Sequence, residues 1–222
     1  MMKSPVIFDI ETGPEDADTL ALFEPEFSAP ANYKDPAKIE AKIAEQRDSW
    51  AQSAALHATT GRVLALGYTE DGEDVTILTE DQPGGEAQLI KKFWKLACPS
   101  GAWRTLIGFN SNRFDLPFLV RRAVKLGVRP PHGLLKGRYL HPCFIDLMDQ
   151  WRCGDWQASI SLDNLAKHLG LEPKTGDGAR FAELYESDRA AALDYLRRDV
   201  ELTAEVAFRI GVVKPATSHT DY

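Results

Sequence analysis

The chain has 222 residues, of which 44% are hydrophobic and 27% charged, and this ordinary globular composition excludes global disorder. Its 33 acidic and 26 basic residues give a formal charge of −7, so any contact with nucleic acid must use a local basic patch. Three cysteines without a CxxC pair argue against a disulfide framework and favour a reducing, cytoplasmic location, and the absence of a signal peptide or a long apolar run argues against a membrane partner.

The first predicted strand covers residues 5–10, a short β-branched apolar run that ends at acidic residues. Residues 15–56 break this pattern, because a proline-containing loop leads into a helical stretch that Asp35 can cap, with Pro36 in its first turn. We interpret them as a helical insertion between the first two strands. The apolar runs 61–70 and 75–80 then form a hairpin, so the sheet is expected to begin with an antiparallel meander.

Helices and strands alternate along the rest of the chain. The pattern predicts a helix at 86–97, a strand at 105–110, a helix at 116–126, a strand at 143–147, a helix from Ser161 to Gly170 and a helix from Ser187 to Ile210. Ser161 and Ser187 are the expected caps of the last two helices. This order predicts an α/β fold with a mixed sheet, a single domain over residues 1–213 and a flexible tail at 214–222.

Asp9 and Glu11 carry the clearest signal for a site. They stand one residue apart at the end of an apolar strand, and residues i and i+2 of an extended chain point to the same face, so both carboxylates aim at one place. Two such anions repel each other unless a cation lies between them, and hard oxygen ligands suit Mg²⁺ or Mn²⁺. A lone pair of this kind more often caps a strand end in solvent.

Two further acids stand where they could join this pair. Asp115 follows a predicted strand and starts a helix, a place where the helix dipole favours an acid for structural reasons alone. Tyr195 and Asp199 lie four residues apart on the last helix and share one face, which by itself indicates only a solvated surface. Their order and their placement on strand, loop and helix are what point to a common site.

Together these residues resemble the three motifs of the DEDD exonucleases, especially the tyrosine-bearing subgroup and the proofreading exonuclease domains of family B DNA polymerases. The DxE motif matches Asp9 and Glu11, the N-x₃-[FY]-D motif matches Asn110, Phe114 and Asp115, and the Y-x₃-D motif matches Tyr195 and Asp199. The resemblance covers nearly the whole chain except residues 15–56. It implies a ribonuclease-H-like mixed sheet flanked by helices, and a stand-alone 3′–5′ exonuclease that removes nucleoside monophosphates from single-stranded DNA.

The resemblance also implies a mechanism with two divalent ions, Mg²⁺ or Mn²⁺, roughly 3.5–4 Å apart. In this pattern Asp9 bridges both ions, Glu11 and Asp199 complete the water-bearing one, and Asp115 holds the second largely through water. Tyr195 would orient the nucleophilic water. It is a poor base, since a phenol with a pKa near ~10 is mostly protonated at neutral pH.

Several residues are candidates for contacts with the nucleic acid. By resemblance, Asn110 and Phe114 would hold the terminal nucleotide, although Phe114 is equally consistent with a core position. Lys174 lies in a loop where a cation could touch a phosphate, and a solvated lysine is the simpler interpretation.

Lys34, Lys38 and Lys42 recur every four residues in the insertion and could form a basic stripe that clamps nucleic acid. Glu40 and Glu45 lie on the same predicted helix, so we favour an exposed face with ion pairs. A clamp predicts that replacing the three lysines weakens binding and flattens its salt dependence.

Other polar residues are set aside. His141, Cys143 and Cys153 fit no structural zinc spacing, and Asp146 is left outside the site because four acids are already assigned. Two alternatives stay open: an RNA 3′–5′ exonuclease, since a metal site reads the phosphate, and a non-catalytic nucleic-acid-binding protein that kept the fold. The sequence identifies no polymerase or recombination partner.

Overall fold

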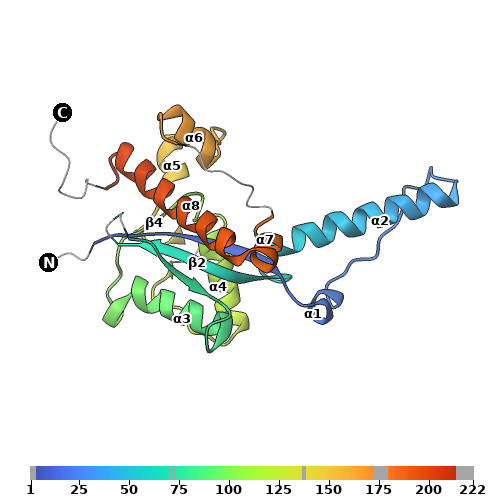
Figure 1. Cartoon of the computed structure of the whole chain (residues 1–222), viewed down its shortest axis with the longest axis horizontal. Coiled ribbons are helices and arrows are strands. Elements are labelled where there is room, and N and C mark those ends of the chain that lie inside the picture. Colours follow the sequence, from blue (N-terminus) through green and yellow to red (C-terminus); the bar gives the residue numbers. More distant parts are fainter. Residues whose placement is uncertain (1–3, 71, 73, 137–138, 173–179, 214–222) are drawn as a thin grey trace.

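The structure is a computed structural model that describes residues 4–70, 72, 74–136, 139–172 and 180–213. A sheet with helices on both faces forms the body, and an arm extends from one end of it (Figure 1). The strands are β1 (Val6–Pro14), β2 (Gly61–Thr69), β3 (Thr76–Thr79), β4 (Leu106–Gly108), β5 (Leu135–Lys136), β6 (Tyr139–Leu140) and β7 (Phe144–Asp146).

The helices follow the predicted alternation with the strands. They are α1 (Ala17–Ala21), α2 (Pro36–Ser53), α3 (Gly85–Ala97), α4 (Asp115–Lys125), α5 (Leu147–Arg152), α6 (Leu162–His168), α7 (Phe181–Ser187) and α8 (Arg189–Arg209), with short 3₁₀ turns η1 (Ala54–Leu56) and η2 (Pro99–Gly101).

Within the described chain, the main sheet has the strand order β3-β2-β1-β4-β7. The first three strands are antiparallel neighbours, whereas β1, β4 and β7 run parallel. The predicted meander and the mixed α/β sheet flanked by helices are therefore confirmed. β5 and β6 pair with each other in a separate small sheet.

The two faces of the sheet pack against different helices. Val6, Phe8 and Ile10 of β1 belong to one core cluster with apolar residues of α3 and α4. Ile7 belongs to a cluster on the other face, with apolar residues of α8. Because side chains alternate along a strand, Asp9 and Glu11 share the face of Ile7, which is the face that α8 covers.

The arm consists of α1, α2 and the chain between them, and it lies between β1 and β2 as predicted (Figure 1). Asp35 caps α2 by accepting a hydrogen bond from the Ala37 backbone N–H at 3.0 Å, and Pro36 is the first helical residue. No residue from 14 to 53 is buried. Among the described residues, no helix has both the length and the apolar character that crossing a membrane would require.

The prediction for the last helix was wrong at its start. Ser187 ends α7, and its hydroxyl donates to the Glu183 carbonyl at 2.7 Å. The cap of α8 is Asp188, whose carboxylate accepts from the Ala191 backbone N–H at 3.1 Å. Two residues with good capping side chains stand side by side, and the fold of the chain before them decided which one caps. The predicted tail at 214–222 lies outside the described residues.

Candidate active site

The site forms where β1 loses its neighbour on one side. β4 pairs with β1 only at Val6 and Ile7, because it is three residues long rather than the six predicted. The backbone N–H of Ile10 therefore meets no strand on that side. It donates instead to Oδ1 of Asp115, at 3.1 Å, so the short strand brings the first residue of α4 against β1.

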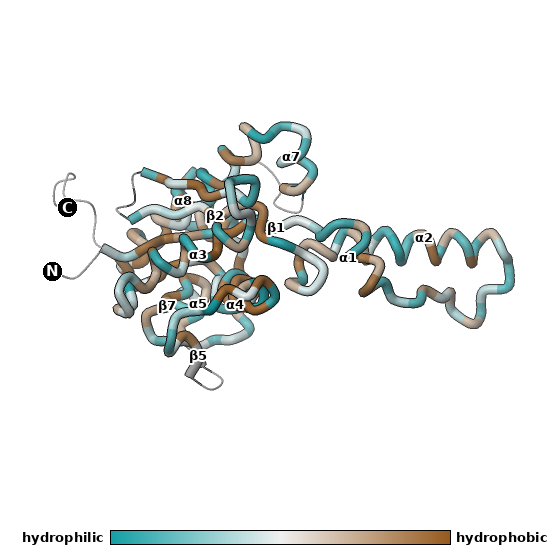
Figure 2. The backbone as a smooth tube through the Cα atoms, turned by 90° about the horizontal axis from the view of Figure 1, so that it is seen from below, coloured by the Kyte–Doolittle hydropathy of each residue, from teal (hydrophilic) through white to brown (hydrophobic). Residues whose placement is uncertain are grey.

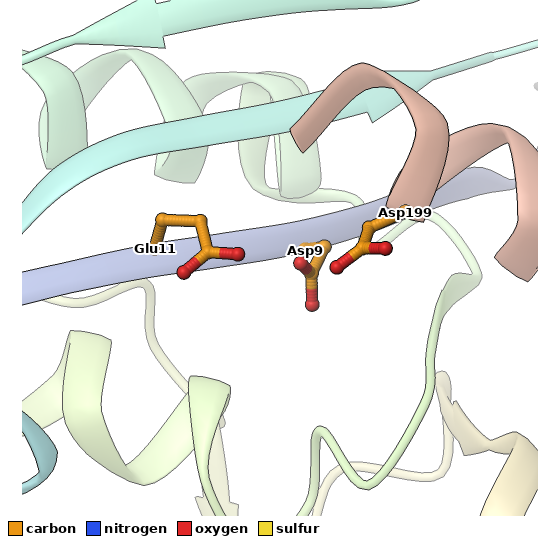
Figure 3. Close-up of side chains that lie close together, drawn as sticks. All are labelled: Asp9, Glu11 and Asp199. Atoms are coloured by element: carbon orange, nitrogen blue, oxygen red, sulfur yellow. The ribbon is translucent and has the colours of Figure 1, made fainter. Parts of the chain in front are cut away.

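Three of the predicted acids converge on one point. One carboxylate oxygen from each of Asp9, Glu11 and Asp199 lies within 4.8 Å of the other two. Figure 3 shows the three side chains reaching into the same space, two of them from β1 and the third from α8. Asp199 is buried, whereas Asp9 and Glu11 are half-buried.

Gly67 explains how α8 comes so close to β1. It lies directly across from Asp9 in the β1–β2 ladder, on the face that α8 covers. A Cβ atom at this position would stand 2.8 Å from Cγ2 of Val200 and 3.1 Å from Cγ of Leu196. Because Gly67 has no side chain, α8 can lie close to the sheet at this point. Asp199 on α8 therefore lies beside Asp9.

Asp115, the first residue of α4, is the fourth acid near this place. Its side chain is 3% exposed and shares a hydrogen bond with the side chain of Asp9. Burial raises the pKa of Asp115 to about 7, and the Asp146 carboxylate adds to the increase, against the lowering effect of backbone N–H groups. The structure therefore places Asp115 beside Asp9, next to the group that Asp9 forms with Glu11 and Asp199.

The donor set suits a hard divalent cation. Three oxygens within 4.8 Å of one another lie no more than about 2.8 Å from a common point, close to the 2.0–2.6 Å that is roughly the range for Mg²⁺ or Ca²⁺. Carboxylates are the ligands such ions prefer, and several carboxylates in one place repel each other without a cation. The residues present fit a divalent metal. Asp9 belongs to the group with Glu11 and Asp199 and also contacts Asp115.

The other motif residues lie near these acids along the chain. Tyr195 is 8% exposed, one turn before Asp199 on α8, and its ring lies 6.3 Å from that of Phe181. Phe114 is half-buried, packs against the core cluster under α4 and lies 5.6 Å from the Phe118 ring. Asn110 has a left-handed backbone, with φ of 57°, at the turn that leads away from β4.

Asp146, which the sequence motifs left outside the site, supports the site in the structure. Its Oδ1 accepts from the backbone N–H groups of Asn110 at 2.8 Å and Met148 at 2.9 Å, while Oδ2 accepts from Asn112 at 3.0 Å. The carboxylate is 2% exposed. It thus fixes the turn that joins β4 to Asp115. The sequence signal that pointed to it was its position at the end of a predicted strand.

Asp146→Asn is expected to destabilise the fold by about 1–3 kcal/mol, because an amide NH₂ would face one of the three N–H donors and leave it unsatisfied. The loop carrying Asn110 would loosen, so catalytic turnover should fall as well. Urea unfolding and nuclease rates measure the two effects. Asp194→Asn, at an exposed position on α8, is the control. Equal stability and turnover in both variants would contradict a positioning role for Asp146.

The remaining candidates lie away from these acids or outside the described chain. Lys34, just before α2, and Lys38, in its first turn, are exposed, and Lys42 pairs with Glu45 at 2.8 Å. This ion pair agrees with the interpretation of α2 as a solvated face. Lys174 lies outside the described residues.

Comparison with known proteins supports the same fold. The chain matches the structure of the family B DNA polymerase from the hyperthermophilic archaeon Pyrobaculum calidifontis, with a TM-score of 0.60 and 18% sequence identity. The match covers 95% of this chain and 25% of the polymerase, so the chain spans about a quarter of that protein's length. This likeness shows the ribonuclease-H-like fold. A search of curated proteins finds no match.

A family model described as "Predicted 3'-5' exonuclease related to the exonuclease domain of PolB" matches residues 54–222. The match contains Asp115, Tyr195 and Asp199 and begins where α2 ends, so Asp9 and Glu11 lie outside it. The pairing of β1 with β2 joins these two acids to the matched part. Because the model covers about three quarters of the sequence, the chain belongs to this family of predicted 3′–5′ exonucleases related to the PolB exonuclease domain.

Proposed function

We propose that the protein is a metal-dependent 3′–5′ exonuclease of the tyrosine-bearing DEDD type, which removes nucleoside monophosphates from single-stranded DNA. The observation that carries this proposal is the group formed by Asp9, Glu11 and Asp199, with Asp115 in contact with Asp9. Membership of the exonuclease family supports the reaction class. The strand preference and the choice of Mg²⁺ or Mn²⁺ rest on the resemblance of the motifs alone.

The residues of the site have distinct tasks in this proposal. Asp9, Glu11 and Asp199 hold one divalent ion through their converging oxygens, and Asp9 and Asp115 provide ligands for a second. Divalent ions bound in this way lower the pKa of a bound water and stabilise the charge that develops on the phosphate and the leaving oxygen. Asp199 and Tyr195 lie one helical turn apart, so the phenol can orient the attacking water without being the base.

Asn110 and Phe114 are proposed to hold the terminal nucleotide. Asp146 fixes the backbone of Asn110 by accepting its N–H. The side chain of Asn110 would then make hydrogen bonds with the terminal nucleotide. Phe114 is only half-buried, so part of its ring can pack on a base or sugar while the rest contributes to the core.

A time course on a 5′-labelled single-stranded DNA oligonucleotide tests the function. We expect a ladder that shortens from the 3′ end when Mg²⁺ or Mn²⁺ is present and no cleavage after chelation. The same digestion with an RNA of matched sequence decides between DNA and RNA, because the metal site itself reads only the phosphate. Binding of both oligonucleotides without release of any nucleotide would contradict the proposal and favour a non-catalytic protein.

A further inference from the structure

The charges of α3 and α4 differ from those of the whole protein. From Ala87 to Arg129 the chain has nine bases and a single acid, Asp115, although its overall charge is −7. Asp115 is buried at the site, as are Arg104 and Arg122 in the core. The exposed charges of this stretch are therefore all positive: Lys91, Lys92, Lys95, Arg113, Arg121, Lys125 and Arg129.

The packing of α3 and α4 turns these bases to the outside. Leu89, Ile90, Phe93 and Trp94 of α3 are buried against the sheet, so Lys91, Lys92 and Lys95 occupy the opposite face of the helix. α4 buries its apolar side in the same core cluster and leaves Arg121 exposed. The two helices contact each other on one face of the sheet, the face seen in Figure 2.

Most of these exposed bases are not paired with an acid in the described part of the chain. Lys125 forms an ion pair with Glu15. Within the described part of the chain, the other six form no ion pair with a carboxylate. We call these six residues the basic surface: Lys91, Lys92, Lys95, Arg113, Arg121 and Arg129.

The basic surface begins at the site. Arg113 is exposed in the turn between Asn110 and Asp115, and its backbone N–H donates to the Asn110 carbonyl at 3.1 Å. Arg121 lies six residues beyond Asp115 on α4, a distance of about 9 Å along the helix axis. A stacked strand advances about 3.4 Å per nucleotide, so a strand whose 3′ end lies among the acids would meet Arg113 and Arg121 within its first few nucleotides, and only a longer strand would reach the lysines of α3.

We propose that the basic surface on α3 and α4 binds the phosphate backbone of the single strand upstream of the nucleotide being removed. This inference rests on the proposed function and extends it from the terminal nucleotide to the body of the substrate. Lysines and arginines that are not paired with carboxylates attract a polyanion over several nucleotides, and they do so without reading the bases. The surface would thus hold the shortened strand near the acids between successive cleavages.

The arm is a poorer candidate for the same task. From Asp16 to Ser53 it has eight acids and four bases, so its own charge is −4. Two of the four bases are paired, Lys42 with Glu45 and Arg47 with Glu24, both at 2.8 Å. Replacing Lys34, Lys38 and Lys42 is therefore a matched control for replacing Lys91, Lys92 and Lys95, because each set of substitutions removes three positive charges from one short stretch of the chain.

The test compares two triple variants, Lys91→Ala/Lys92→Ala/Lys95→Ala and Lys34→Ala/Lys38→Ala/Lys42→Ala, with the unchanged protein. Substrates are single strands of 4 and 16 nucleotides, as DNA and as RNA. For the α3 variant, kcat/KM on the 16-mer should fall roughly tenfold or more, mainly through KM, and change less than about twofold on the 4-mer. The slope of log binding constant against log salt should fall by about 2, since each phosphate contact contributes roughly 0.7. The arm variant should match the unchanged protein.

Each other result has a definite meaning. An α3 variant that keeps the kcat/KM and salt dependence of the unchanged protein on the 16-mer overturns the inference, as does a loss confined to the arm variant. Failure of the unchanged protein to cleave any substrate refutes the proposed function instead. Binding of the 16-mer by metal-free protein still tests the basic surface in that case. Circular dichroism confirms that both variants are folded.

Discussion

Asp9→Ala is expected to lower the exonuclease rate by at least about 10³-fold, equivalent to about 4 kcal/mol of transition-state stabilisation. Asp9 is the acid that contacts both Asp115 and the group with Glu11 and Asp199, so its removal takes a ligand from every proposed metal position. Steady-state cleavage of a 5′-labelled strand at saturating Mn²⁺ measures the loss.

Thermal unfolding separates this effect from a loss of structure. Without metal, the Asp9→Ala protein should be at least as stable as the unchanged one, since fewer carboxylates then repel each other in one place. Adding Mn²⁺ should stabilise the unchanged protein and have little effect on the variant. Asp48→Ala, an exposed acid on α2, should behave like the unchanged protein in both assays.

Tyr195→Phe is the informative comparison for Asp9→Ala. The ring would stay in its packed position beside Phe181, so the fold and the response to Mn²⁺ should be retained. Only the hydroxyl that orients water is lost, and turnover should fall roughly tenfold to a hundredfold. Nuclease activity that survives Asp9→Ala would contradict the assigned site, whatever Tyr195→Phe does.

Arg122→Met is expected to cause the largest loss of stability, about 3–5 kcal/mol. The guanidinium is 2% exposed and donates to both Glu86 oxygens, at 2.8 and 2.6 Å, and to Glu15 at 2.7 Å. Without it, the buried Glu86 carboxylate has no compensating charge. Urea unfolding measures the change, and the melting temperature should fall by roughly 10 °C.

Two further variants locate the cause. Adding Glu86→Gln to Arg122→Met should recover part of the loss, because the amide oxygen can still accept the Val63 backbone N–H while the unpaired charge disappears. Arg121→Met, at the exposed neighbouring arginine, should change stability by less than about 0.5 kcal/mol. A loss of similar size in Arg121→Met would show that the ion pairs of Arg122 are not responsible.

The ion pairs of Glu15 with Arg122 and Lys125 make the stability of the fold depend on pH. Burial alone would raise the pKa of Glu15, but hydrogen bonds and charge interactions with Lys125 and Arg122 outweigh it and hold that pKa below 4.5. Its contribution to stability is therefore present above about pH 4.5 and is lost as the pH falls through the lowered value.

Local patterns in the sequence predicted the features that depend on near neighbours. The i, i+2 spacing of Asp9 and Glu11 was enough to place both carboxylates on one strand face, and Asp35 followed by Pro36 was enough to start α2. The cap of α8 was missed because Ser187 and Asp188 are equally good capping residues, and only the end of α7 distinguishes them.

Features that join distant segments required the tertiary structure. The closeness of Asp199 to Asp9 depends on Gly67, because a side chain at this position would collide with α8. Asp146 became a support for the site when β7 paired with β4, and the basic surface arose when α3 and α4 packed side by side. A sequence determines which side chains share a strand or helix face, since the repeat of the backbone fixes it. Which faces then meet depends on packing across the whole sheet, and that is a property of the folded chain.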